Sequence, residues 1–161
     1  MFFTGTDMIE GDGAAATFHA LIKSQGNGQV VAETYATSGM TAKRPYVMTY
    51  QYTTSGNGWF QPLAISASNK GLVGIASAAI ASGCMGWVTV RGQVLNASSP
   101  ATVQMNGSMG HAVYWAGASG LAASSSAYIG ALHQIGFLIE EATATYAANI
   151  FLTGNQIAQS V

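Results

Sequence analysis

With 161 residues, the chain has the length of one ordinary domain, enough to bury a hydrophobic core without disulfide staples. Only 7% of its residues are charged and the formal net charge is −1, whereas a typical soluble domain has roughly 25% charged residues. The few basic residues form no cluster that could neutralise a row of phosphates, which argues against a nucleic-acid partner. The surface must therefore be built from uncharged polar residues, or be covered by another protein.

Membrane and secretory segments are not indicated either. The longest nearly apolar run, residues 71–81, is interrupted by Ser77 and is far shorter than the roughly 20 residues that cross a bilayer. The N-terminal stretch "MFFTGTDMIEGDG" has no basic region of the kind that opens a signal peptide, so we expect a soluble mature chain. Cys84 is the only cysteine, which excludes an intrachain disulfide framework.

In chain order, residues 1–13 are predicted to be a separate arm, followed by a single β-rich domain over residues 14–161. The stretch "AAATFHALIK" at 14–23 fits either a short helix or a strand, because Ala favours a helix while Thr, Phe and Ile also suit a strand. Asn-Gly pairs at 27–28, 57–58 and 106–107 predict tight turns, since both residues tolerate positive φ.

The segments between these pairs alternate with the period of a strand. In "YVMTYQYT", residues 46–53, Tyr46, Met48, Tyr50 and Tyr52 fall on one face. Further strands are predicted at 29–36, 112–116, 135–140 and 148–153, whereas the Ala-rich stretch 76–83 is too short for a confident helix. The spacing of these segments predicts an all-β fold: a small β-barrel or β-sandwich with short strands, Gly and Asn turns, and an extended N-terminal arm.

The stretch "SGCMGWVTVRGQVL" at 82–95 predicts a strand with two unlike faces. Val88, Val90 and Val94 share one side, which suits a buried core. The other side carries Trp87, Thr89, Arg91 and Gln93 and is available to solvent or to a neighbouring subunit. Trp and Arg are enriched at interface hot spots, so these four residues are candidate partner-binding residues, the alternative for Trp87 being an ordinary core aromatic.

Catalytic and metal-binding patterns are not found in the sequence. The pentapeptide G-x-S-x-G of a serine hydrolase does not occur, and His19, His111 and His133 stand alone without ligands at metal-binding spacing. Glu140 and Glu141 are adjacent, so on a strand they point to opposite faces, which argues against a pair of acids that share a proton and favours a strand end that enters a turn. We therefore expect a protein without enzymatic activity, cofactor or metal.

Three segments, in this order, resemble a group of tailed-phage structural proteins, namely small capsid-associated or head-decoration proteins. They are "GLVGIASAAIASGCMGWVTVRGQVL" at 71–95, "GHAVYWAGASGLAAS" at 110–124 and "IGFLIEEATATYAANIFLT" at 135–153. Those proteins similarly run from an "ASG…GWV.V.G" strand through a turn and strand to a closing pair of strands. The resemblance covers roughly residues 64–153. Its matching positions are Gly83, Gly86, Trp87, Val88, Val90, Gly92, Gly110, Val113, Ile135, Gly136, Leu138, Glu140, Ala142, Ile150 and Leu152.

The resemblance implies a cement protein on the outer surface of an icosahedral phage head, where it would stabilise contacts between major capsid subunits. Its partners would be the major capsid protein and copies of itself in a homotrimer, with no nucleic acid and no membrane. Phe2 and Phe3 in the arm are further candidates for capsid contact, through a strand added to an exposed sheet edge; a frayed terminus is the alternative.

Two other functions are compatible with the residues. A tail or head-fibre adhesion module would bind host surface glycans through Tyr46, Tyr50, Tyr52 or Trp59. A carbohydrate-binding β-module outside virions would use the same aromatic residues as a stacking platform. Such platforms usually carry carboxylates or amides beside the rings, and here only Gln51 and Gln61 are near in the sequence, which weighs against this function.

Overall fold

The computed structural model describes residues 22–52, 58–63, 71–98, 105–115, 121–123, 133–154 and 156–157. Every regular element in these ranges is a strand, which confirms the all-β prediction. The strands are β1 (Ile22–Ser24), β2 (Val30–Ala36), β3 (Pro45–Tyr52), β4 (Gly58–Pro62), β5 (Gly71–Ala76), β6 (Cys84–Ser98), β7 (Met105–Gly107), β8 (Ala112–Trp115), β9 (Leu121–Ala123), β10 (His133–Leu138), β11 (Ala142–Thr145), β12 (Ala147–Leu152) and β13 (Gln156–Ile157).

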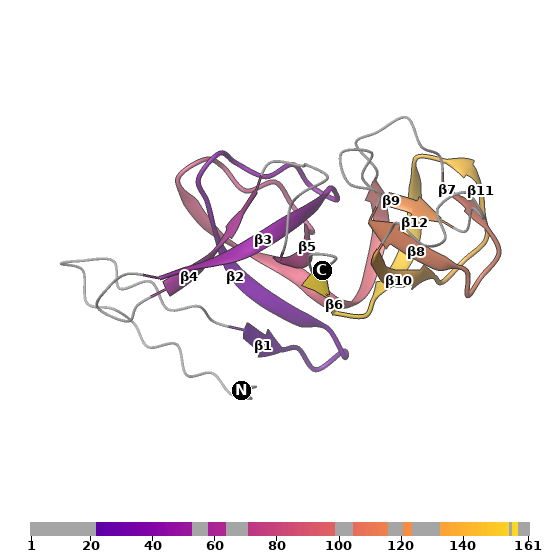
Figure 1. Cartoon of the computed structure of the whole chain (residues 1–161), viewed down its shortest axis with the longest axis horizontal. Coiled ribbons are helices and arrows are strands. Elements are labelled where there is room, and N and C mark those ends of the chain that lie inside the picture. The colour runs from indigo at the N-terminus through magenta and orange to yellow at the C-terminus, as the bar shows by residue number, and fades with distance from the viewer. Residues whose placement is uncertain are drawn as a thin grey trace.

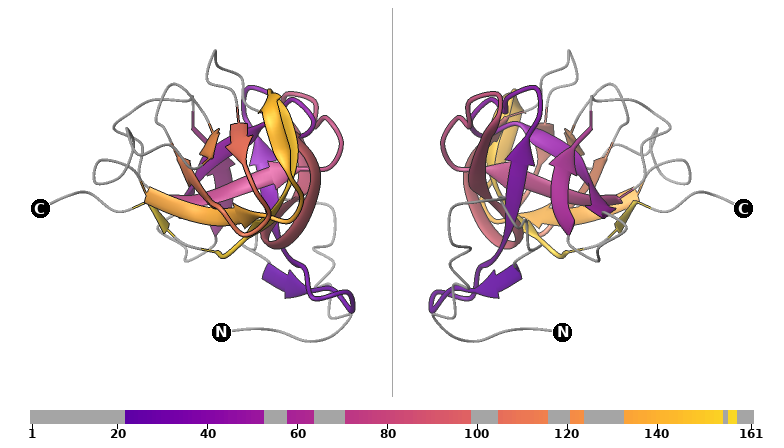
Figure 2. Two further views of the ribbon diagram at one scale, coloured as in Figure 1. Left: turned by 90° about the vertical axis from the view of Figure 1, so that its right-hand side faces the viewer. Right: turned by 90° about the vertical axis from the view of Figure 1, so that its left-hand side faces the viewer.

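Five strands close into a barrel in the order β2-β4-β3-β5-β6, and β6 returns to pair with β2. The sheet continues from β6 through β12, β10 and β8 to β9. Figure 1 shows these two parts side by side, with the barrel on the left and the second sheet on the right. The short strand β1 extends the barrel sheet beyond β2 and projects from the body of the molecule in Figure 2.

Strand β6 belongs to both parts. Its first half pairs with β2 from Cys84 to Arg91, and its second half pairs with β12 from Gly92 to Ser98. Gly92 stands at the change of partner with φ of 104°, a backbone conformation that side-chain-bearing residues rarely adopt. A β-carbon at this position would also press on the backbone of Gln29. The bend of β6 therefore depends on glycine.

Two hydrophobic cores result from this arrangement. Inside the barrel, Val88 and Val90 of β6 pack with Ala32, Met48 and Ala76. The second core contains Val94, further along β6, and also takes in residues from the outer side of β3 and β5. Its members are Val47, Val73, Ile75, Val94, Ala97, Met105, Val113, Trp115, Leu121, Ile135, Leu138, Ala142, Ala148, Ile150 and Leu152. The valine side of the 82–95 strand is thus buried as predicted, but it is divided between two cores.

Most predicted strands agree with the structure within one or two residues at each end. The turn predicted at Asn27-Gly28 is present, with Gly28 at positive φ. The turn predicted at Asn106-Gly107 is wrong, because both residues belong to β7. A β-carbon on Gly107 would collide with the His111 ring, so a larger residue there would require the ring to move. Residue Asn57, the arm 1–13 and most of 14–23 lie outside the described residues.

Candidate interaction face

The outer side of the β2–β6 pair carries a group of side chains of the types found at protein interfaces. Cross-strand register places Glu33 opposite Trp87 and Tyr35 opposite Met85. These side chains point away from the barrel core because the residues between them, Ala32, Ala36 and Val88, point into it. Lys23 of β1 completes the group, with its ammonium nitrogen 4.0 Å from the centre of the Trp87 ring. We call Lys23, Glu33, Tyr35, Met85 and Trp87 the β2–β6 face.

The exposure of this face suits a contact surface. Met85 is 38% exposed, and the other four side chains are partly exposed. Trp87 is partly exposed, unlike a residue of either core, and the Lys23 ammonium lies over its ring. A cation over an indole ring is attracted by the ring quadrupole, so the contact between Lys23 and Trp87 is favourable.

The other sequence-predicted site residues lie further along β6. Thr89 is only 8% exposed, because it faces Val31 of β2 and Ile75 of β5 inside the junction of the two parts. Arg91 and Gln93 are exposed. The structure therefore brings Trp87 together with side chains of β1 and β2, and not with Arg91 or Gln93 in one flat row. Phe2 and Phe3 lie outside the described residues, and the role of all six as contact residues stays a prediction.

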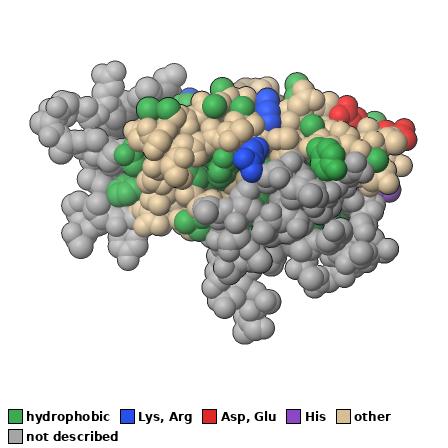
Figure 3. All heavy atoms as spheres, turned by 90° about the horizontal axis from the view of Figure 1, so that it is seen from above, with side chains coloured by type: hydrophobic (Ala, Val, Ile, Leu, Met, Phe, Trp, Pro, Cys, Tyr) green, Lys and Arg blue, Asp and Glu red, His purple; other side chains and the backbone are tan. Residues whose placement is uncertain are grey.

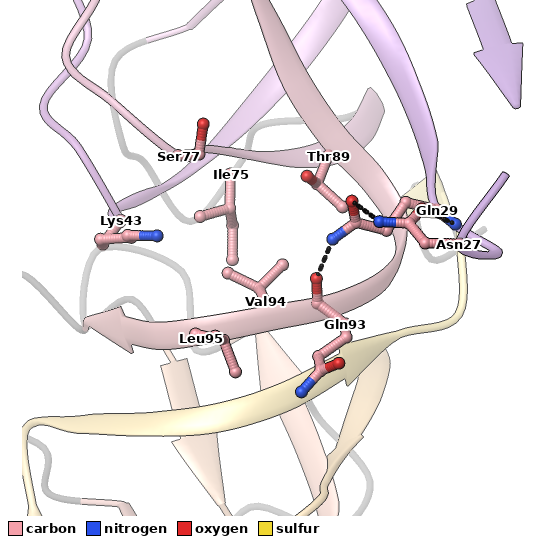
Figure 4. A pocket seen from close by; sticks show the side chains of 9 residues that line it. All are labelled: Asn27, Gln29, Lys43, Ile75, Ser77, Thr89, Gln93, Val94 and Leu95. Carbon is pink, nitrogen blue, oxygen red and sulfur yellow. Dashed lines mark hydrogen bonds between the residues drawn. The ribbon is translucent and has the colours of Figure 1, made fainter. Parts of the chain in front are cut away.

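A cleft of about 280 Å³ lies on the inner side of the bend in β6, between the barrel and the second sheet (Figure 4). Its lining mixes amide, hydroxyl and aliphatic side chains with one lysine: Asn27, Gln29, Lys43, Ile75, Ser77, Thr89, Gln93, Val94 and Leu95. Leu95 is 48% exposed.

One wall of the cleft is a chain of hydrogen bonds. The Gln29 amide N–H₂ donates to the backbone oxygen of Gln93 at 2.6 Å, and the Asn27 amide donates to the side-chain oxygen of Gln29 at 3.0 Å. The backbone N–H of Gln29 donates in turn to Asn27 Oδ1 at 3.1 Å. These bonds, the first two drawn as dashed lines in Figure 4, tie the β1–β2 turn to the bend of β6. The amides are thus engaged with each other and brace the junction.

Side chains of the types that catalyse reactions or bind metals lie apart from one another in the described part of the chain. No group of three or more His, Cys, Asp or Glu that could hold a metal ion is found among the described residues. His111 accepts a hydrogen bond at Nδ1 from the Ser108 backbone at 3.0 Å, and Cys84 is a free, exposed thiol. In the space-filling view of Figure 3, charged side chains are few: Lys and Arg side chains lie near the middle of the face, and Asp and Glu side chains lie toward its right end.

The aromatic residues considered for glycan binding separate into two faces. The hydroxyl oxygen of Tyr46 accepts a hydrogen bond from the Thr41 backbone N–H at 2.8 Å, and its ring packs against the barrel core. Tyr50 is 49% exposed and meets Phe60 edge to face with ring centres 5.7 Å apart. Trp59 lies on the opposite face of the same hairpin. The side chain of Tyr52 lies outside the described residues.

The fold defines an all-β protein with a closed five-stranded barrel joined to a second sheet. No protein-family model and no curated protein matches the chain. A solved structure that overlaps with it is described as the crystal structure of the head fiber gp8.5 N base in bacteriophage phi29. The overlap has a TM-score of 0.44 and 13% sequence identity and covers 81% of this chain and 99% of that chain.

None of the described residues form a helix that is both long and apolar enough to cross a membrane.

Proposed function

We propose that the chain is a non-catalytic structural protein of a tailed-phage head. In this role it binds the outer surface of the capsid as a cement protein, forms a homotrimer, and strengthens contacts between major capsid subunits. The proposal joins the sequence resemblance over residues 64–153 to a surface that suits contacts with other proteins.

The observation that carries the proposal is the β2–β6 face. Trp, Tyr and Met are the residue types that are enriched where proteins meet, and here they stand on neighbouring strands of a closed barrel. A barrel holds them in fixed positions, so little conformational entropy is lost when a partner covers them. Lys23 and Glu33 supply one charge of each sign at the edge of the face, which favours a partner that is close to neutral.

The low charge of the whole chain supports the same role. With 7% charged residues, the molecule has little electrostatic repulsion to overcome when many copies assemble on one shell. Each contact can then be weak, because a trimer that engages three sites at once gains avidity from its high effective concentration. Binding to the native shell also stabilises each folded subunit by mass action.

The test is the copy number of the chain in purified particles of its virus, measured by quantitative mass spectrometry relative to the major shell protein. Copies comparable to those of the shell protein are expected, together with a trimer in light scattering of the isolated protein. A few copies per particle would instead support a tail or head-fibre module. Absence from the particle would overturn any role in the mature virion.

A further inference from the structure

The outer face of the β3–β4 hairpin groups one indole ring with uncharged hydrogen-bonding side chains. The register pairs Gln51 with Trp59 and Thr49 with Gln61. Directly opposite residues in an antiparallel pair share a face, with β-carbons roughly 5 Å apart. The other face of the hairpin carries Met48, Tyr50 and Phe60, of which Met48 belongs to the barrel core and Phe60 packs against it. The four outward residues therefore form one contiguous patch.

This patch is accessible and its hydrogen-bonding capacity is only partly used. All four side chains are partly exposed. The Gln51 amide N–H₂ donates to the Thr49 hydroxyl oxygen at 3.2 Å, which holds the Gln51 side chain along the strand. Within the described part of the chain, the Gln51 side-chain oxygen and the whole Gln61 amide have no hydrogen-bond partner. Two amides with free donors and acceptors thus flank the ring.

We propose that Thr49, Gln51, Trp59 and Gln61 form a carbohydrate-binding site. A primary amide offers a donor and an acceptor side by side, which matches two neighbouring hydroxyl groups of a sugar ring. The indole ring offers a flat apolar surface for the C–H face of that sugar. The patch contains no charged side chain, so its chemistry fits a neutral sugar and gives no partner to the phosphates of a nucleic acid.

The strand geometry places these groups as a stacking site requires. Trp59 and Gln61 are two residues apart on β4, so both project from the same side of the strand. Thr49 and Gln51 repeat this spacing on β3, and the barrel fixes both strands beneath them. The site is therefore built on the rigid part of the molecule. It is separate from the β2–β6 face, and it does not rest on the capsid-binding proposal.

The experiment is a glycan-array screen of the full chain, followed by calorimetric titration with the best-bound free oligosaccharide. We expect saturable binding to neutral glycans. Trp59→Ala should weaken it by about tenfold or more, as for loss of a central aromatic contact. Gln61→Ala should weaken it by several fold, whereas Trp59→Phe should retain part of the affinity because the flat ring remains.

Trp87→Ala is the matched control, since it removes an indole from the β2–β6 face and should leave glycan affinity unchanged. Circular dichroism of each variant reports whether the barrel still folds, and Gln61→Ala keeps the test valid if Trp59→Ala does not fold. The proposal is overturned if the wild-type chain binds no glycan on the array. It is equally overturned if Gln61→Ala and a folded Trp59 variant bind as tightly as the wild-type chain.

Discussion

At the scale of single residues, adjacent glutamates have different surroundings. The Glu140 carboxylate accepts two hydrogen bonds from Asn149, one from the backbone N–H at 2.9 Å and one from the side-chain amide at 2.8 Å. Asn149 Oδ1 in turn accepts the backbone N–H of Asn96 at 2.8 Å, at a bulge where β6 and β12 lose their regular register. Glu140 therefore anchors an irregular part of the second sheet, whereas Glu141 is exposed.

Replacing these two glutamates separately tests that difference. Glu140→Gln turns one acceptor into a donor that faces another donor, so it should lower the free energy of unfolding by about 1–2 kcal/mol. Glu141→Gln makes the same change in net charge and should stay within about 0.5 kcal/mol of the wild-type chain. Urea unfolding measures both. Equal stabilities of the two variants would show that the hydrogen bonds to Asn149 contribute nothing.

A second prediction for a single residue concerns Gly136 on β10. A β-carbon at this position on β10 would collide with the backbone oxygen of Phe151 on the neighbouring strand β12. Because backbone cannot move aside as a flexible side chain can, Gly136→Ala should destabilise the protein by about 1–3 kcal/mol. Gly26→Ala is the control, since open space surrounds Gly26, and it should leave the melting temperature unchanged or slightly raised. A melting temperature of Gly136→Ala equal to that of Gly26→Ala would contradict this view of the β10–β12 contact.

At the scale of elements, the hydrogen-bonded junction at the bend of β6 can be tested in the same way. Gln29→Ala removes the donor to the Gln93 backbone oxygen and should cost about 0.5–1.5 kcal/mol. Hydrogen exchange of residues 92–98, followed by mass spectrometry, should become faster in this variant. Gln93→Ala is the control, because the bond uses only the backbone of Gln93. Unchanged hydrogen exchange in Gln29→Ala would mean that the bend of β6 does not depend on the hydrogen bond from Gln29 to the Gln93 backbone oxygen.

Strand β6 also shows which properties of a strand can be predicted from the sequence and which cannot. Alternation correctly predicts that Val88, Val90 and Val94 are buried, because side-chain direction follows from the strand period. It does not predict the burial of Thr89, which lies on the other side of the strand. It does not predict that Val90 and Val94 fill different cores, because strand partners depend on contacts between distant segments and on the backbone of Gly92. The Asn106-Gly107 pair shows a second limit of prediction from sequence, because the pair predicts a turn there and the structure has a strand. A local turn signal is overruled there by a contact with a distant segment, the pairing of Gly107 on β7 with Ala142 on β11.

The candidate interaction face was only partly predictable for the same reason. Trp87 could be selected from its residue type and its place on the strand. Tyr35 and Met85 join it only through the β2–β6 register, and Lys23 only through the pairing of β1 with β2. The glycan-binding proposal likewise depends on the β3–β4 register. The sequence shows only that Gln51 and Gln61 occur near Trp59 along the chain, whereas the register places both on the same face of the hairpin as Trp59.

At the scale of the whole molecule, the proposed capsid contact predicts that one end of the protein is sensitive to added charge and the other is not. Met85 on the β2–β6 face and Met109, in the turn after β7, are both exposed methionines, at 38% and 71%. Met85→Glu would bury an unpaired carboxylate in the contact, which is costly to desolvate. Met109→Glu makes the same chemical change away from that face.

We therefore expect Met85→Glu to weaken binding to particles that lack the protein by roughly tenfold or more, as for a disrupted interface centre. Met109→Glu should bind like the wild-type chain. Co-sedimentation with the particles measures binding, and light scattering shows whether Met85→Glu also breaks the trimer. Loss of particle binding with an intact trimer would assign the β2–β6 face to the capsid, and loss of both would assign it to contacts between copies. Wild-type behaviour of Met85→Glu in both measurements would exclude this face from the assembly.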